Sequence, residues 1–180
     1  MVYMEPHLLG WEPVLESWLN ELPETLTEDN RTLIKDMFLH YCPCLLNFVR
    51  KAGFSELSPT SDSNLVKSCM NLMDCQLSSV ADATLMAGVS GEQLKAWLEC
   101  FFLFACTWSL GASLDSKGRK AFDGLFKELM TEGLSLENKR RYKILQMVEA
   151  PAKKIVTPFP EAGNVFEYQF EREVCHDILT

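Results

Sequence analysis

The sequence predicts a mainly α-helical fold, with a short N-terminal strand and an extended C-terminal connector that contains one β-strand. Two patterns indicate helices: apolar residues recur every three to four positions in successive segments, and the segment Leu94–Gly111 is apolar nearly all round. One alternating segment, Asn164–Phe170, indicates the C-terminal strand. The 180 residues, 47% of them hydrophobic, suit a single domain with a filled core.

The segment Leu94–Gly111, which reads LKAWLECFFLFACTWSLG, is expected to be the buried central helix. The stretch Phe101–Cys106 holds nothing more polar than a thiol, which is typical of a membrane span or of the centre of a helical core. A membrane span needs about 20 apolar residues, and Lys95 and Glu99 on one side and Ser113–Asp115 on the other cut this run short. We therefore interpret it as a core helix and expect no contact with a membrane.

The N-terminal part of the chain predicts one short strand followed by a helix. The β-compatible run Met1–Glu5 stops at Pro6. A helix is expected to open at Gly10–Pro13, because proline is tolerated in a first turn, and to end at Pro23. Its apolar face consists of Trp11, Val14, Leu15, Trp18, Leu19 and Leu22.

A second helix is expected after a short turn. Thr25 and Glu28 form a candidate capping box, and Thr27 is a rival N-cap. Pro43 breaks or kinks this helix, and the apolar pattern continues beyond it to a C-cap glycine, Gly53. The apolar face consists of Leu33, Ile34, Met37, Phe38, Tyr41, Leu45, Leu46 and Val49.

Capping signals place two further helices around the central one. The polar turn Ser55–Ser63 precedes a third helix, whose apolar face consists of Leu65, Val66, Cys69, Met70, Met73 and Leu77. Residues 78–90 are ambiguous because glycines interrupt the pattern. Ser90 and Gln93 form a capping box for the central helix, and Asp115 is an N-cap for the helix after it. That last helix has an apolar face of Phe122, Leu125, Phe126, Leu129 and Met130.

The character of the chain changes near residue 131. A basic run, Lys139–Arg141, is followed by three prolines between residues 151 and 160, which forbid regular structure between them. The segment Asn164–Phe170 then places its aromatic residues on one face, which is the pattern of a strand.

No group of residues predicts catalysis or a metal site. The segment His40–Cys44 contains a CxC pair and one histidine, but it lacks the second pair of ligands that structural zinc requires. The three histidines are scattered, and none lies in a nucleophile motif. Seven cysteines, an odd number without a secretion signal, are best interpreted as reduced thiols.

The sequence also contains no motif that predicts a phosphate-binding loop. The chain contains neither GxxxxGK[ST] nor GxGxxG. The basic cluster Ser116–Lys120 in a first helical turn could be an anion site, although a solvated charged face is the favoured interpretation. A net charge of −8 argues against a nucleic-acid partner.

The opening stretch MVYMEPHLLGWEPVLESWLNELP resembles the dynein heavy chain, in particular the axonemal type, where the second AAA+ module passes from its last strand into its helical lid. Further stretches agree in the same order, so the resemblance covers nearly all of residues 1–170. These are FVRKAGFSELSPTSDSNLVKSCMNLMD, LKAWLECFFLFACTWSLGASLDSKGRKAFDGLFKEL, the proline-containing connector and NVFEYQF.

The resemblance implies a helical AAA+ lid-type bundle that is part of a larger motor. Residues 1–5 would be the terminal strand of a large subdomain, residues 6–130 the lid, and residues 131–180 the connector toward the third module, with the last ten residues atypical. The parent protein would be an ATP-driven, minus-end-directed microtubule motor. This segment would not be an enzyme by itself, and ATP or ADP with Mg would be bound in the parent module.

The resemblance also implies the partners and the location. The direct partner would be the rest of the dynein AAA+ ring, and contact with the microtubule and with dynein light and intermediate chains would come only through the parent protein. The location would be the cytoplasm and cytoskeleton, in the ciliary axoneme. The alternative hypothesis is a free-standing helical protein-interaction module, because the methionine and aromatic content suits adaptable apolar surfaces.

By resemblance, the sites of interest lie near a nucleotide, and no residue is expected to be catalytic. In active modules an arginine at the start of the third lid helix contacts the γ-phosphate; here Val66 stands at or near its place. The resemblance also suggests Trp97 and Trp108 as anchors of the central helix. The nucleotide-proximal residues implied are Pro6, Leu8, Leu9, Asp62, Asn64 and Lys67.

Overall fold

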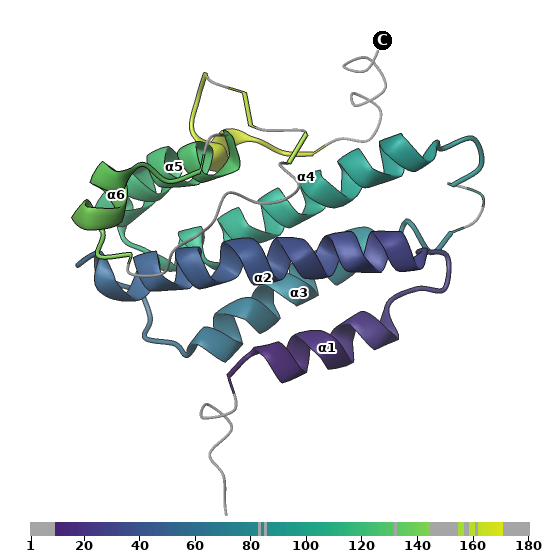
Figure 1. Ribbon diagram of the computed structural model, residues 1–180, viewed down its shortest axis with the longest axis horizontal. Coiled ribbons are helices and arrows are strands. Elements are labelled where there is room, and N and C mark those ends of the chain that lie inside the picture. The colour runs from purple at the N-terminus through teal and green to yellow at the C-terminus, as the bar shows by residue number, and fades with distance from the viewer. Residues whose placement is uncertain are drawn as a thin grey trace, which may run out of the picture.

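The computed structural model describes residues 10–82, 84, 86–131, 133–144, 155–156, 159–160 and 162–170. This part is mainly helical, which confirms the predicted fold class (Figure 1). Two 3-10 helices, η2 (Gly111–Ser113) and η3 (Val165–Glu167), accompany the α-helices. The α-helices are α1 (Glu12–Glu21), α2 (Glu28–Lys51), α3 (Asp62–Leu77), α4 (Gly91–Ser109), α5 (Ser116–Thr131) and α6 (Leu136–Arg141). The predicted strand Met1–Glu5 lies outside the described residues.

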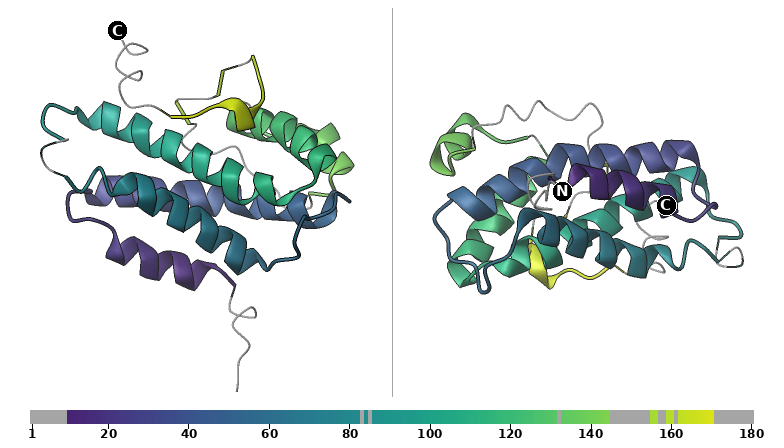
Figure 2. Two further views of the ribbon diagram at one scale, coloured as in Figure 1. Left: turned by 180° about the vertical axis from the view of Figure 1, so that it is seen from behind. Right: turned by 90° about the horizontal axis from the view of Figure 1, so that it is seen from below.

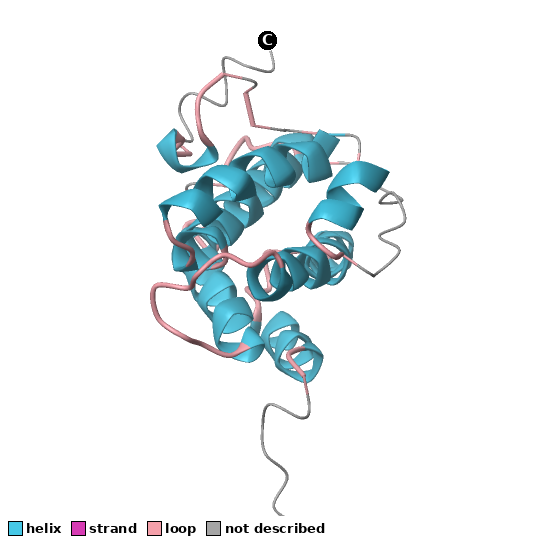
Figure 3. Cartoon of the chain, turned by 90° about the vertical axis from the view of Figure 1, so that its left-hand side faces the viewer, coloured by secondary structure: helices cyan, strands magenta, loops and turns pink. Residues whose placement is uncertain are grey.

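Helices α2, α3 and α4 form the body of the bundle. Helix α1 packs on α2 and α3 from the side away from α4, while α5 and α6 lie at the end of the bundle where α4 ends (Figures 1 and 2). Viewed from that end, the described residues form only helices and loops (Figure 3). The α4 helix therefore contacts both the N-terminal helices and the C-terminal part of the chain.

The helix ends follow the capping signals in the sequence. Thr27, the rival candidate, caps α2, because its side chain accepts a hydrogen bond from the Asn30 amide. Ser90 and Gln93 form the predicted capping box of α4. The α2 helix continues through Pro43 without a break. Its buried side chains lie on both sides of the proline and hold the helix in place despite the lost backbone hydrogen bond.

Helix α1 is fixed to its neighbours at several points. Trp18 donates a hydrogen bond to Asp74 of α3 at 2.8 Å, and Glu16 pairs with Lys35 of α2 at 2.6 Å. The Arg31 guanidinium donates to the carbonyls that follow the end of α1, including that of Leu22 at 2.8 Å, which satisfies groups that a helix C-terminus leaves open. These contacts fix the position of α1 relative to α2 and α3.

The core is aromatic where α4 meets α2. Phe102 of α4 is fully buried, and its ring lies 5.2 Å from that of Phe38 and 5.8 Å from that of Tyr41. By length and composition, residues Gly91–Ser113 could cross a membrane, but 72% of their most apolar window is buried inside the bundle. This burial supports the interpretation of α4 as a core helix.

The expectation that two tryptophans anchor α4 is half right. Trp97 is buried, whereas Trp108 is 43% exposed, so the prediction for Trp108 is wrong. The reason is its helical register: Phe104 and Trp108 lie four residues apart on one stripe of α4, and Phe104 is also incompletely buried. Trp108 instead makes an edge-on contact with Phe166, at 5.9 Å between ring centroids.

The predicted strand Asn164–Phe170 is wrong. Asn164 caps a 3-10 helix, η3, and Tyr168 follows in an extended conformation. Among the described residues the β-pairing consists of one isolated bridge, between Glu56 and Leu114. The alternating aromatic residues are satisfied by packing on helices rather than by pairing with a strand, because Phe166 contacts Phe122 and Phe170 contacts Phe101.

Glu128 joins α5 to α6 through hydrogen bonds. It accepts from the Ser135 amide at 2.6 Å and from the Asn138 side chain. Burial by itself raises the pKa of Glu128, but these hydrogen bonds outweigh burial and hold the pKa below its usual value of 4.5. The carboxylate form is therefore the one that fixes the start of α6.

Acidification is expected to loosen the junction between α5 and α6. A carboxyl group whose pKa is lower in the folded state stabilises the fold above its unfolded pKa, and this contribution is lost as pH falls through the folded pKa. For Glu128 the loss is expected below pH 4.5. NMR titration of the Ser135 amide should show it, and Glu128→Gln should remove that titration. A Ser135 amide shift that titrates equally in both proteins would contradict this assignment.

Candidate functional site

The candidate site is the place where the start of α1 meets the start of α3. Ser61 caps α3 by accepting a hydrogen bond from the Asn64 amide at 3.2 Å. The Ser63 hydroxyl donates to the carbonyl of Gly10 at 3.4 Å. Because α1 and α3 run side by side in the same direction, the segment that leads into α1 lies against the first turn of α3 (Figures 1 and 2). Residues far apart in the sequence thus meet at one end of both helices.

Besides Asp62, two of the six nucleotide-proximal candidates are exposed at the start of α3. Asn64 and Lys67 are exposed, and their spacing of three residues places them on neighbouring positions of the helix surface. Lys67 also lies four residues after Ser63, the residue that contacts Gly10. A cation and an amide therefore face the solvent beside the entry to α1.

Val66 points the other way, into the core. Its side chain is fully buried, in agreement with its place on the predicted apolar face of α3. The residue that the resemblance is expected to place at or near a phosphate-contacting arginine is thus a packing residue, and its side chain brings no hydrogen-bond donor to the surface. Lys67, one position later, is the nearest side chain that carries a positive charge on this turn.

Asp62 is committed to an ion pair. Its carboxylate accepts from the Nε of Arg50 at 2.7 Å, and the same guanidinium also contacts Glu56. Burial lowers the pKa of Arg50, but the two carboxylates outweigh burial and raise it. Arg50 thereby ties the end of α2 to the start of α3. No local pattern predicts this pair, because its members lie twelve residues apart in the sequence.

The other three candidates, Pro6, Leu8 and Leu9, lie outside the described residues. The described chain begins at Gly10, whose positive φ of 74° suits glycine. The structure therefore gives the location at which this segment joins the bundle, and the roles of its residues stay predictions.

The CxC pair is divided between two sides of α2. Cys42 lies in the core with Cys69 and Cys106, whose sulfur atoms are 3.8 Å apart. Burial raises the pKa of Cys44 to about 12, so this thiol stays protonated, whereas metal ligation and nucleophilic attack need the thiolate. Within the described residues, no group of three or more histidine, cysteine, aspartate or glutamate residues could hold a metal ion.

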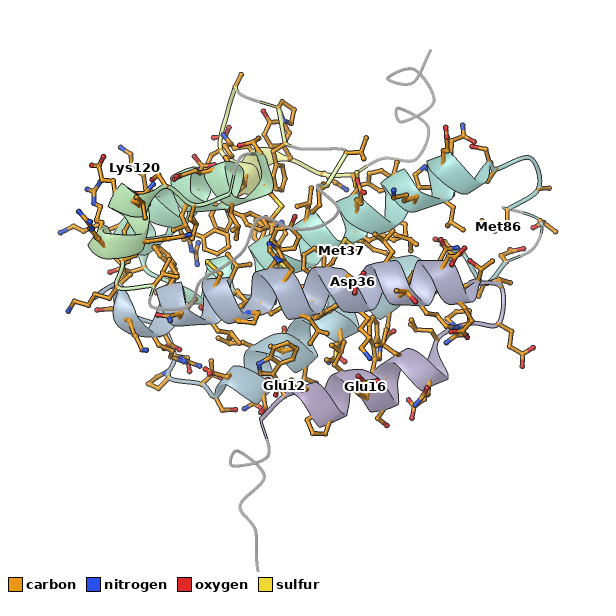
Figure 4. All side chains as sticks on the ribbon, viewed as in Figure 1. Glu12, Glu16, Asp36, Met37, Met86 and Lys120 are labelled. Atoms are coloured by element: carbon orange, nitrogen blue, oxygen red, sulfur yellow. The ribbon has the colours of Figure 1, made fainter. Side chains whose placement is uncertain are left out.

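The first turn of α5 already has an internal anion. Asp115 accepts a hydrogen bond from the Gly118 amide at 2.7 Å, and Arg119 donates to the carbonyls of Ala112 and Leu114 at 2.8 Å and 3.0 Å. Lys120 extends from the outer end of the bundle (Figure 4). These contacts support a solvated charged face rather than an anion site at this turn.

Comparison with known proteins gives a consistent result. The family model of the dynein heavy chain AAA lid domain matches residues 34–176. The chain is 30% identical over 178 residues to dynein axonemal heavy chain 3 of Homo sapiens, and 33% identical over 177 residues to dynein axonemal heavy chain 12 of Rattus norvegicus. These matches cover 96% and 95% of the chain, but only 4% and 5% of the relatives. No solved structure gives a significant match.

Proposed function

The chain belongs to the dynein heavy chain AAA lid family, and on that premise we propose that it is the helical lid of one AAA+ module in an axonemal dynein motor. The lid covers a bound nucleotide and passes the nucleotide-dependent change to the rest of the ring. The resemblance of its opening residues favours the second module, with the connector leading toward the third. The protein then works in the ciliary axoneme, as part of the cytoskeleton.

The observation that carries this proposal is the contact between the start of α1 and the start of α3. A lid needs elements that are fixed to one another, so that they close as one body over a ligand held by another part of the protein. Here the Ser63–Gly10 hydrogen bond joins these elements, and the Trp18–Asp74 hydrogen bond, about two to three turns further along, fixes their relative position. The two helices can therefore move as one body.

The burial of Val66 bears on whether the lid contributes to nucleotide binding or to nucleotide hydrolysis. Removal of one charge-assisted donor from a phosphoryl-transfer site costs on the order of 3 kcal/mol of transition-state stabilisation. With valine packed in the core at this position, the lid supplies binding surface, while the phosphate-contacting groups come from elsewhere in the parent module. We propose that this module holds nucleotide and does not turn it over rapidly.

The same proposal assigns the cofactor and the partners to the parent protein. ATP or ADP with Mg is held mainly by the large subdomain, and the direct partner of the lid is the remainder of the AAA+ ring. The microtubule and the dynein light and intermediate chains are reached only through the parent heavy chain. The chain alone should release no phosphate from ATP.

Hydrogen–deuterium exchange in an axonemal heavy chain that carries this lid would test the proposal. Addition of ADP is expected to slow exchange in the first turn of α3, around Asn64–Lys67, because a covered nucleotide protects the turn that faces it. Helix α6, on the opposite side of the bundle from α1 (Figure 1), is the internal control and should not respond. Exchange at α3 that is unchanged by ADP, or a response confined to α6, would overturn the proposed site.

A further inference from the structure

The described residues from 155 onward lie along the bundle as a strap, which we define as residues 155–156, 159–160 and 162–170. Ile155 and Val165 of the strap are buried. Its aromatic residues also pack on the helices, over a length that includes both α4 and α5. The pairs, with their centroid distances, are Phe159–Phe126 at 5.8 Å, Phe166–Phe122 at 6.1 Å and Phe170–Phe101 at 5.3 Å.

Two carboxylates hold the backbone of the strap at separate points. Glu99 of α4 accepts from the Val156 amide at 2.8 Å, and Asp123 of α5 accepts from the Val165 amide at 2.8 Å. Lys127 adds a contact from α5 to the Gly163 carbonyl and pairs with Asp123 at 3.3 Å. Each of the two helices thus holds the strap by a hydrogen bond, which a main-chain amide of the strap donates to a carboxylate of the helix, in addition to the apolar contacts.

The burial of Glu99 is the unusual feature. This residue is only 1% exposed in the middle of the most apolar helix. A buried carboxylate is costly unless hydrogen bonds compensate it, and an apolar side chain of the same size would fill the site more favourably. Val156 is 71% exposed, so the hydrogen bond to Glu99 holds the backbone of the strap and does not serve to bury that residue.

Tyr41 of α2 borders the same point. Burial raises the pKa of Tyr41 to about 12, the Ile155 backbone acts in the opposite direction, and the negative charge of Glu99 adds to the rise. The phenol therefore stays neutral beside the carboxylate. Glu99 lies where α2, α4 and the strap meet. A displacement of the strap at this point therefore also affects the packing of the core.

We infer that Glu99 and Asp123 are latch residues, which fasten the strap to α4 and α5 so that the strap moves with the lid and can separate from it when the two hydrogen bonds break. What the strap would transmit depends on the proposed function, and this part of the inference rests on it. The latch is a property of the chain itself and is present without nucleotide. Backbone amides, rather than side chains, are the groups that the carboxylates hold, so the latch depends on the path of the strap.

The latch can be tested by amide exchange in the 180-residue chain without nucleotide. Glu99→Leu removes the acceptor and keeps an apolar filling, so exchange at Val156 is expected to accelerate on the order of tenfold or more, while amides of α3 such as Met70 keep their protection. Glu99→Gln keeps an acceptor oxygen and should restore protection of the strap. Glu92→Gln, at an exposed position of the same helix, is the matched control and should change nothing.

Asp123→Ala tests the second latch point without disturbing the centre of the core, because the Asp123 side chain is 21% exposed. It should accelerate exchange at Val165 and leave α3 protected. Unchanged strap exchange in both Glu99→Leu and Asp123→Ala would overturn the inference, as would an equal acceleration at α3, which indicates a purely structural role. Such a result would leave the ADP response of α3 intact, so the two proposals fail separately.

Discussion

Replacement of Phe102 with alanine is expected to lower the free energy of unfolding by about 3–5 kcal/mol. The ring is fully buried where α4 meets α2, and it contacts the rings of Phe38 and Tyr41. Its removal loses apolar burial, leaves a cavity and breaks two aromatic contacts at once. Urea denaturation followed by circular dichroism measures the change.

Phe104 provides the matched control for this prediction. It lies two residues later on the same helix, but it is only partly buried and contacts the exposed Trp108. Phe104→Ala should therefore cost clearly less than Phe102→Ala. If the two variants lost the same stability, α4 would not have the buried and exposed sides that the structure gives it.

Most of the helical fold could be predicted from the sequence because its signals are local. Apolar spacing and capping residues act within one or two turns, so the ends of α2 and α4 could be recognised at Thr27 and Ser90. The choice between Thr25 and Thr27 stayed open, since both threonines satisfy the same local rule. Tertiary contacts decided it, through Thr25, whose hydroxyl donates to the carbonyl of Val80.

The wrong predictions concern segments whose local sequence pattern is compatible with two different structures. Alternating aromatic residues in Asn164–Phe170 suit a strand, but they equally suit a segment that packs across helices, here as a 3-10 helix with an extended end. Only the helices beneath, which present Phe101 and Phe122, distinguish the two. Glu99 is similar: its place beside the apolar run indicates a polar boundary of the central segment, but the amide that it binds lies 57 residues away.

The features of the candidate site also divide into those that local sequence patterns predict and those that they do not. The burial of Val66 and the exposure of Lys67 follow from the helical register of α3, which the apolar spacing defines. The Asp62–Arg50 pair and the Ser63–Gly10 contact join different elements, so no periodicity predicts them. Function near the nucleotide could therefore be predicted only through the family resemblance.

A single methyl group added at Gly118 is expected to destabilise the chain by up to about 2 kcal/mol, because the cost of overpacking exceeds the gain in helix propensity. A Cβ there would lie 2.9 Å from the Cβ of Leu114 and 3.0 Å from that of Phe54. Both neighbouring atoms are attached directly to the backbone, so neither can rotate away, and the overpacking must displace α5 from the loop before α3. Thermal unfolding of Gly118→Ala, with the free-energy change evaluated at a common temperature, measures this cost.

Gly124→Ala is the matched control, and it shows why packing decides whether Gly118→Ala raises or lowers the stability. Both glycines lie in α5, where alanine is favoured over glycine by up to about 1 kcal/mol. At Gly124 a Cβ meets nothing within 4 Å, so the propensity gain is unopposed and this variant should be more stable than the wild type. At Gly118 the same gain is present, but overpacking of about 1–3 kcal/mol exceeds it. Equal stabilisation by both substitutions would mean that α5 does not approach Phe54 as closely as the structure shows.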